Sequence, residues 1–397
     1  MSVTPSPEEL VARAHALAPN FRERQAETES NRRVPRESIE ECRRADLFRI
    51  LQPKRYGGFE YGFDTLVDVA AAVASGCGST GWVYAVNAQQ RWIIGMYPEQ
   101  AQDEVWNDDE TSLSSSSFHP SGLAIPTDDG YRLTGKWMYC SGVDNAHWMI
   151  LGIRIAAAPE DEPTDQGYML VPREEVEIDD NWQVAGLAGT GSLNVSCKDV
   201  FVPAHRLLRL EEAQSGRPPG SVLNDGWLYR VPFFAATSIG LCASIIGMAE
   251  GAFADYVEAT RTRSTRGAAL SQPKPMAELP TIQLRVGEAA SRIDAARMLI
   301  DRDCKDIMKT IAAGKTLTEA QRARNKGDLG FAVSLATQAI DQLFESGGGG
   351  GMFSKSTVQR FWRDAHAGAM HISMNRDVLF TLRGRVTLGL PAGPVQF

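Results

Sequence analysis

The segment YRLTGKWMYCSGVDNAHWMILGIRI, at residues 131–155, decides the fold class because it interrupts a chain that otherwise has helical patterning. It is rich in aromatic and β-branched residues, and the polar run after Cys140 marks a turn between two strands. Similar stretches occur at YMLVP (168–172) and NVSCKDVFVP (194–203), each close to Gly, Pro, Asn or Asp. The pattern predicts an antiparallel β-domain, a barrel or sandwich, over residues 111–215.

The flanks of this β-domain read as helix. Residues 1–110 predict an N-terminal helical domain that begins near Pro5–Glu9, with Ser6 as its N-cap. Residues 216–397 contain four long helical stretches, which predict a C-terminal four-helix bundle. These stretches are 232–262, 278–312, 317–345 and 356–386. The expected fold is therefore mainly α with a central β-domain, in an order that few architectures share.

Composition and charge exclude several classes of protein. The 397 residues carry a net charge of −8, which argues against nucleic acid or an anionic membrane as a partner. The six cysteines form no CxxC pair and the six histidines show no metal-ligand spacing, so no metal is expected. No apolar run reaches the roughly 18 residues that a membrane span needs. We expect a cytoplasmic globular protein with reduced thiols.

Candidate site residues lie in polar, glycine-rich segments. The run Gly347–Gly351 lacks every Cβ, so its backbone N–H groups can approach an anion such as a pyrophosphate, or it is a flexible loop between helices. The hydroxyls of Ser114–Ser117 suit a polar ring edge, or they belong to a solvated loop. Ser141 suits a turn as well as a ligand. A lone histidine such as His371, among apolar neighbours, is more often a satisfied core residue than a functional one.

The order of these segments, rather than any one of them, resembles the group D flavin-dependent monooxygenases over about residues 8–390. These are the oxygenase components of two-component systems and share the acyl-CoA dehydrogenase fold. LFRILQPKRYGG (47–58) supports only that fold, and GSTGWVYAV (78–86) and GKWMYCSGVDNAHW (135–148) also match. The GxxGTGS pattern of Gly186–Ser192 and the WRDxHA pattern of Trp362–Ala367 point to the monooxygenase branch.

The resemblance implies a reduced-flavin-dependent monooxygenase that hydroxylates an aromatic or heteroaromatic small molecule through a C4a-hydroperoxyflavin. Reduced flavin, FMNH2 or FADH2, would come from a separate NAD(P)H:flavin reductase, and O2 is the second substrate. The resemblance also implies a homotetramer and a role in aromatic compound catabolism. N-hydroxylation and S-oxidation remain alternatives within the branch.

The resemblance also assigns roles to residues. His371 and Ser141 match catalytic positions, His371 near the reacting carbon and Ser141 facing the flavin N5 region. The residues matching positions that hold the cofactor are Ser115, Ser116, Cys140, Ser141, Arg263, Gly348, Gly349 and Gly350. Those expected to contact the substrate are Trp82, Gln90, Phe118 and His119.

This chain departs from the family pattern at three of these positions. Gln90 replaces a histidine that several phenol-hydroxylating relatives carry, which puts simple phenol ortho-hydroxylation in doubt. His119 stands where relatives have a small or apolar residue, and it either contacts the substrate or caps the loop. Cys140 replaces a common serine and is a weaker hydrogen-bond donor, so Ser141 is expected to carry the N5 contact alone.

Two other functions remain open at this point. An acyl-CoA dehydrogenase with an atypical base is one, although the usual glutamate position appears to be Ile372 and cannot remove a proton. Glu250 and Glu258, on an earlier helix, would have to supply the base instead. A catalytically idle relative that serves as a scaffold is the other, and it would bind neither flavin nor substrate.

Overall fold

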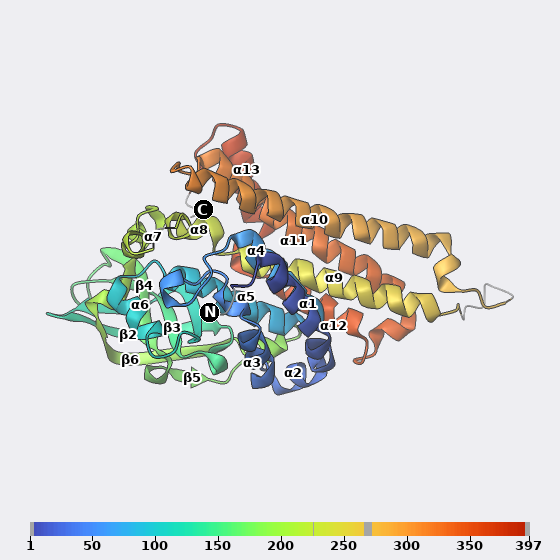
Figure 1. Cartoon of the computed structure of the whole chain (residues 1–397), viewed down its shortest axis with the longest axis horizontal. Helices are drawn as coiled ribbons and strands as arrows, with labels where there is room; N and C mark the ends of the chain where they lie inside the picture. The colour runs from blue at the N-terminus through green and yellow to red at the C-terminus, as the bar shows by residue number, and fades with distance from the viewer. Residues whose placement is uncertain (1–3, 225, 266–271, 394–397) are drawn as a thin grey trace.

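A computed structural model describes residues 4–224, 226–265 and 272–393 (Figure 1). The N-terminal part is helical, and its first helix begins at the predicted cap: the Ser6 hydroxyl accepts from the Glu9 N–H and the Glu9 carboxylate accepts from the Ser6 N–H. Its helices are α1 (Pro7–Glu23), α2 (Gln25–Asn31), α3 (Arg36–Arg44), α4 (Phe63–Gly76), α5 (Gly78–Ile94) and α6 (Glu99–Trp106).

The central domain is one seven-stranded sheet with the order β5-β6-β2-β1-β3-β4-β7. Neighbouring strands are antiparallel, as expected, except that β1 and β3 run parallel. The prediction of a fully antiparallel domain is therefore wrong for the β1–β3 pair. The chain crosses over β1 after β2 instead of returning by a hairpin. The strands are β1 (Ser114–Pro126), β2 (Gly130–Cys140), β3 (Trp148–Ile155), β4 (Asp165–Pro172), β5 (Glu177–Asp179), β6 (Leu193–Pro203) and β7 (Leu207–Arg209).

The C-terminal part is the predicted helical bundle, drawn in yellow to red in Figure 1. A short α7 (Leu210–Gln214) joins it to the sheet. Its helices are α8 (Phe233–Ala236), α9 (Ile239–Thr262), α10 (Pro280–Ala312), α11 (Glu319–Ser346), α12 (Thr357–Ala369) and α13 (Arg376–Thr387). The prediction of one helix over 356–386 is wrong, since the chain breaks between α12 and α13.

Side-chain capping explains that break. His371 precedes a short 3₁₀ turn, η11 (Ile372–Met374), and its ring accepts a hydrogen bond from the Ser373 N–H. Asn375 then caps α13, with its side-chain oxygen accepting from the Val378 N–H. These local bonds compete with helix continuation, so His371 sits at a corner of the chain rather than on a helix face.

Helix α5 lies at the centre of the molecule and is buried along nearly its whole length. It packs on α4, α9 and β1, so it contacts all three parts of the structure. One apolar core joins the N-terminal helices to the bundle, and a separate core lies within the sheet. Among the described residues, the stretch 233–262 alone is long and apolar enough to cross a membrane. Because 72% of its apolar window is buried in the protein, it reads as a core helix.

Candidate active site

The strongest polar cluster of the predicted site gathers around Ser141, just after β2 ends. The indole N–H of Trp82, on α5, donates to the Ser141 hydroxyl at 3.3 Å. The Ser141 and Ser192 hydroxyls are 2.7 Å apart, and Thr190 lies 2.7 Å from Ser192. Ser115, on β1, donates to the backbone carbonyl of Ser141 at 2.9 Å. The N-terminal helical part and the sheet thus meet at one buried group of hydroxyls.

His371 joins this cluster through Trp82. The two rings lie edge to face, with centroids 5.9 Å apart and planes inclined by 61°. The break after α12 places the histidine there, so sequence periodicity could not have shown it.

The hydrogen bonds of His371 define its protonation. Its Nδ1 accepts from the Ser373 N–H at 3.2 Å and lies 2.7 Å from the Ser373 hydroxyl. Because a nitrogen that accepts carries no proton, the neutral ring holds its proton on Nε2. Crowding of the ring by protein atoms lowers the His371 pKa to about 4. The residue is exposed to solvent on its other side, and the lowered pKa leaves the imidazole neutral at pH 7.

Gln90 bridges two serines of β1. Its side-chain oxygen accepts from the Ser114 hydroxyl at 2.6 Å, and its amide donates to the Ser116 oxygen at 2.7 Å. Strand alternation puts both serines on the face of β1 that meets α5, whereas Ser115 points to the opposite face. Since Ser116 accepts from Gln90, its own hydroxyl proton is available to another acceptor.

Phe118 continues the same face of β1 into an aromatic group. Its ring lies 5.1 Å from that of Phe233 and 5.4 Å from that of Tyr168, both edge to face. Phe233 also stacks near Trp92. Gln90, Ser116 and Phe118 therefore form a surface that is polar at one end and aromatic at the other.

Arg91, the neighbour of Gln90, fixes this part of β1 on α5. Its buried guanidinium donates to the backbone carbonyls of Glu110, Thr111 and Ser112 at 2.9–3.0 Å, and it also contacts the Gln52 side chain. Burial lowers the Arg91 pKa to about 9. Among the described residues no carboxylate pairs with this cation; the carbonyl dipoles that precede β1 hold it in place.

Two predicted site residues point away from the cluster. Cys140 lies in the core of the sheet, fully buried, because successive strand residues face opposite sides and Ser141 takes the site-facing turn. Burial raises the pKa of its thiol to about 12. His119 is exposed and its ring pairs with the Ser121 hydroxyl at 2.8 Å, within the irregular middle of β1 rather than in a loop.

Arg263 and the glycine run lie close to each other, but not at the Ser141 cluster. The Arg263 guanidinium donates to the Gly347 carbonyl at 3.1 Å, and Gly350 lies beside it. The run forms a 3₁₀ turn, η10 (Gly348–Met352), just before α12, whereas His371 follows the end of α12. At 1.5 Å per residue, the 13 residues of α12 separate these sites by roughly 20 Å within one chain.

The two glutamates that could serve a dehydrogenase are both engaged elsewhere. Glu250 pairs with Arg297 through both carboxylate oxygens, at 2.6 and 3.2 Å. Glu258 is exposed and pairs with Arg261. Ile372, at the usual position of the base, is exposed and apolar.

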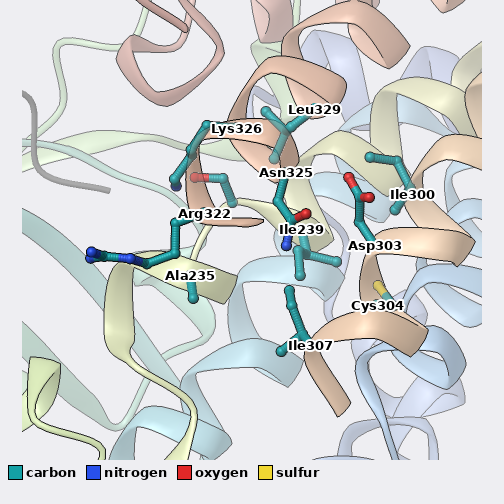
Figure 2. Close-up of a pocket in the computed structure, with 11 residues that line it drawn as sticks. Ala235, Ile239, Ile300, Asp303, Cys304, Ile307, Arg322, Asn325, Lys326 and Leu329 are labelled. Atoms are coloured by element: carbon teal, nitrogen blue, oxygen red, sulfur yellow. The ribbon is translucent and has the colours of Figure 1, made fainter. Parts of the chain in front are cut away.

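A small cavity lies among α8, α9, α10 and α11, and none of the predicted site residues line it (Figure 2). Its volume of about 20 Å³ suits one or two waters. Burial raises the pKa of Asp303 to about 6 and lowers that of Lys326 to about 8. Figure 2 shows both side chains beside Asn325, which fits a hydrated polar pocket in the bundle.

Sequence reasoning missed three residues next to Ser141. Thr190 and Ser192 belong to the GTGS motif, which the sequence analysis used only to indicate the family. Two hydroxyl residues alternating with glycines could have indicated a buried polar site. Tyr139 is exposed and has a φ of 64°, which is rare for an aromatic residue. Its ring meets Trp182 edge to face, 6.1 Å between centroids.

Comparison with family models and curated proteins shows the family of the chain. Residues 4–109 match the acyl-CoA dehydrogenase N-terminal domain, and residues 239–376 match the acyl-CoA dehydrogenase C-terminal domain. The chain is 37% identical to the oxygenase component of an FADH2-dependent resorcinol hydroxylase from a Rhizobium species, over 96% of this chain and 94% of that protein. It is 36% identical to the flavin-dependent monooxygenase oxygenase subunit HsaA of Rhodococcus jostii, over 96% and 98%.

Solved structures show the same similarity. The HsaA monooxygenase from M. tuberculosis superimposes with a TM-score of 0.91 at 35% identity, over 98% of this chain and 99% of that one. XiaF from a Streptomyces species, in complex with FADH2 and glycerol, gives a TM-score of 0.90 at 31% identity, over 98% of both chains.

Proposed function

The chain belongs to the oxygenase components of flavin-dependent monooxygenases with the acyl-CoA dehydrogenase fold, and we propose that Trp82, Ser141 and His371 form its active site. It is an enzyme that uses reduced flavin and O2 to hydroxylate an aromatic small molecule. The observation that carries the site assignment is the convergence on one indole ring of a serine from the sheet and a histidine from the bundle.

The residues at this junction suit a flavin ring. Ser141 is 8% exposed and its hydroxyl accepts from Trp82, which leaves one lone pair for a ligand, and the exposed Tyr139 lies two residues before it. When bound, reduced flavin would supply the activation of O2 for transfer to the substrate. The Nε2–H of His371 would then donate a hydrogen bond to a group that develops negative charge, and the neutral ring would not need to lose a proton first.

We place the aromatic substrate against Gln90, Ser116 and Phe118. The free Ser116 proton would be donated to an oxygen on the substrate, and Phe118 would cover its ring. Gln90 holds this serine but does not titrate, so a phenolic substrate would not lose its proton to residue 90. Resorcinol, named for a 37% identical relative, is the first compound to test.

The glycine run and Arg263 fit the phosphate end of a flavin bound by a second copy of the chain. A guanidinium beside exposed glycines suits an anion, and an added Cβ at Gly348 or Gly349 would meet nothing within 4 Å. The site lies roughly 20 Å from His371 of the same chain, which is why we assign it to a neighbour in a homotetramer. Exposed apolar residues on the bundle supply a surface for that assembly: Leu284, Met298, Phe331, Met370, Ile372 and Phe380.

A separate NAD(P)H:flavin reductase completes the system, as the term oxygenase component in the names of the relatives implies. We propose a cytoplasmic location, where a reductase, reduced nucleotide and O2 are available together. The scheme applies to FMN and to FAD, because Trp82, Ser141 and His371 are assigned to the isoalloxazine ring that both flavins share. C-hydroxylation is the preferred reaction, since the cluster places an oxygen-binding serine beside an aromatic wall.

The experiment adds oxygenated buffer to protein premixed anaerobically with reduced FMN or FAD and resorcinol. We expect hydroxylated product from the wild type, and mainly hydrogen peroxide from the Ser141→Ala and His371→Ala variants. Ser334→Ala is the matched control, because Ser334 has the same 8% exposure as Ser141 but bonds only within its own helix. Equal product from all four proteins would refute the site assignment.

A further inference from the structure

The hydroxyls behind Ser141 form a continuous chain of hydrogen bonds that ends on a backbone carbonyl. Thr190 lies in a 3₁₀ turn, η5 (Ala188–Thr190), and donates to the carbonyl of Leu187 at 2.8 Å. Ser192 lies 2.7 Å from Thr190, and Ser141 lies 2.7 Å from Ser192. Trp82 completes the chain at the other end.

The two ends of the chain fix the direction of every hydrogen bond in it. A carbonyl only accepts, so the single proton of Thr190 is committed to Leu187. Thr190 must then accept from Ser192, and Ser192 must accept from Ser141. The indole N–H only donates, so Ser141 accepts from Trp82. The Ser141 proton therefore points back toward Ser192, and its remaining lone pair is what it presents to the site.

Burial keeps the chain in this state. Thr190 is 1% exposed and Ser192 is 4% exposed, so bulk water does not replace either partner. The Gly142 N–H also donates to the Thr190 carbonyl at 2.8 Å, which ties the two loops together. The glycines of the motif are needed for this path: Gly191 has a φ of 51°, and a Cβ on Gly189 would lie 2.3 Å from a Thr28 methyl group.

We propose that Ser192 and Thr190 are positioning residues that hold Ser141 as a hydrogen-bond acceptor and thereby select reduced over oxidised flavin. Reduced flavin carries a proton on N5 and can donate to such an acceptor, whereas oxidised flavin offers only a lone pair there. The inference rests on the proposed function, in which Ser141 faces N5. With its own proton held by Ser192, Ser141 repels the oxidised form and accepts from the reduced form.

The test measures dissociation constants rather than turnover. Oxidised flavin is titrated by fluorescence quenching, and reduced flavin is titrated anaerobically, against the wild type, Ser192→Ala and Thr190→Val. Ser192→Ala removes the acceptor that holds the Ser141 proton. Thr190→Val removes the acceptor of Ser192, so the Ser192 hydroxyl can turn and donate to Ser141 instead. In both variants the Ser141 proton becomes free to be donated to oxidised N5. We expect the ratio of the oxidised to the reduced dissociation constant to fall about fivefold or more, the effect of one neutral hydrogen bond.

Controls separate this inference from folding and from the proposed function. Thr190→Ser keeps the hydroxyl and should keep the wild-type ratio, and Ser334→Ala should also leave it unchanged. An unchanged ratio in both Ser192→Ala and Thr190→Val would overturn the inference even if both flavins bind. Failure of the wild type to bind either flavin would instead refute the proposed function. If Ser192→Ala does not fold, the Thr190→Val and Thr190→Ser pair decides.

Discussion

The indole of Trp82 lies edge to face with the imidazole of His371, with ring centroids 5.9 Å apart, although the two residues belong to opposite ends of the chain. The same indole donates its N–H to Ser141. One buried side chain on α5 therefore sets the relative positions of the histidine from the bundle and the serine from the sheet. Changes at any of the three are expected to alter the same reaction.

Replacement of His371 by alanine should lower the yield of hydroxylated product per flavin by about 100-fold. This is the lower end of the range of rate effects expected when a positioned proton donor is lost. The flavin that no longer gives product should give hydrogen peroxide instead, because O2 would still be reduced. The measurement is product and peroxide by chromatography and a coupled assay. A variant that keeps full coupling would show that the Nε2–H does not act on the reacting group.

The lowered pKa of His371 also predicts a pH dependence of stability. Its folded-state pKa of about 4 lies below the ordinary value of 6.5, so the unfolded chain binds the proton more readily between these values. The stabilising contribution is therefore fully present above pH 6.5 and is lost as the pH falls toward 4. Urea denaturation from pH 4 to 7 should show a shallower slope for His371→Gln than for the wild type.

Replacement of Gln90 by leucine should destabilise the fold and weaken substrate binding. It removes the acceptor of the buried Ser114 hydroxyl and the donor to Ser116, at a cost of about 1–3 kcal/mol in the free energy of unfolding. The KM for the aromatic substrate should rise more than kcat falls, since the Ser116 hydroxyl loses its orientation. Ser116→Ala should reproduce the KM change. A KM equal to that of the wild type in both variants would move the substrate away from this face of β1.

Replacement of Arg91 by methionine should cost about 3 kcal/mol or more, because the Thr111 and Ser112 carbonyls lose their donor together and the Glu110 carbonyl keeps only Gln52. Arg261→Met is the matched control. That arginine is exposed and pairs only with exposed Glu258, so its loss should change stability little. Thermal and urea denaturation of the two variants compare the costs directly. Equal costs would mean that the carbonyls find other donors.

Replacement of Asp364 by asparagine should stabilise the protein at pH 8. The Asp364 carboxylate accepts from the Leu187 N–H at 2.6 Å, and burial raises its pKa to about 6 against an ordinary 3.8. The folded state therefore binds the proton more readily, and this contribution to stability declines as the pH rises from 4 to 6. The amide keeps an acceptor for Leu187 without a buried charge. Denaturation curves at pH 4.5 and pH 8 should diverge for the wild type and converge for the variant; a wild-type-like divergence in the variant would assign the effect to another group.

Much of the fold followed from the sequence alone. The order of helix, sheet and bundle was correct because hydrophobic period and turn residues are local properties of the chain. The motifs at Gly186–Ser192 and Trp362–Ala367 indicated the right family, which the comparisons confirm. One predicted helix boundary was wrong. The helix predicted over 356–386 ends at Ala369, because the His371 and Asn375 side chains cap the chain there.

The arrangement of the site came only from the tertiary structure. Ser141 and Ser192 are 51 residues apart, and Gln90 and Ser116 are 26 apart, so no local pattern shows that their hydrogen bonds exist. Strand alternation turned Cys140 into the core, and the length of α12 separated Arg263 from His371. Local patterns in the sequence were enough to predict the order of helices and strands and the family of the chain. Packing of α5 against the sheet and the bundle decided which side chains meet, because hydrogen bonds between distant segments depend on how whole elements dock.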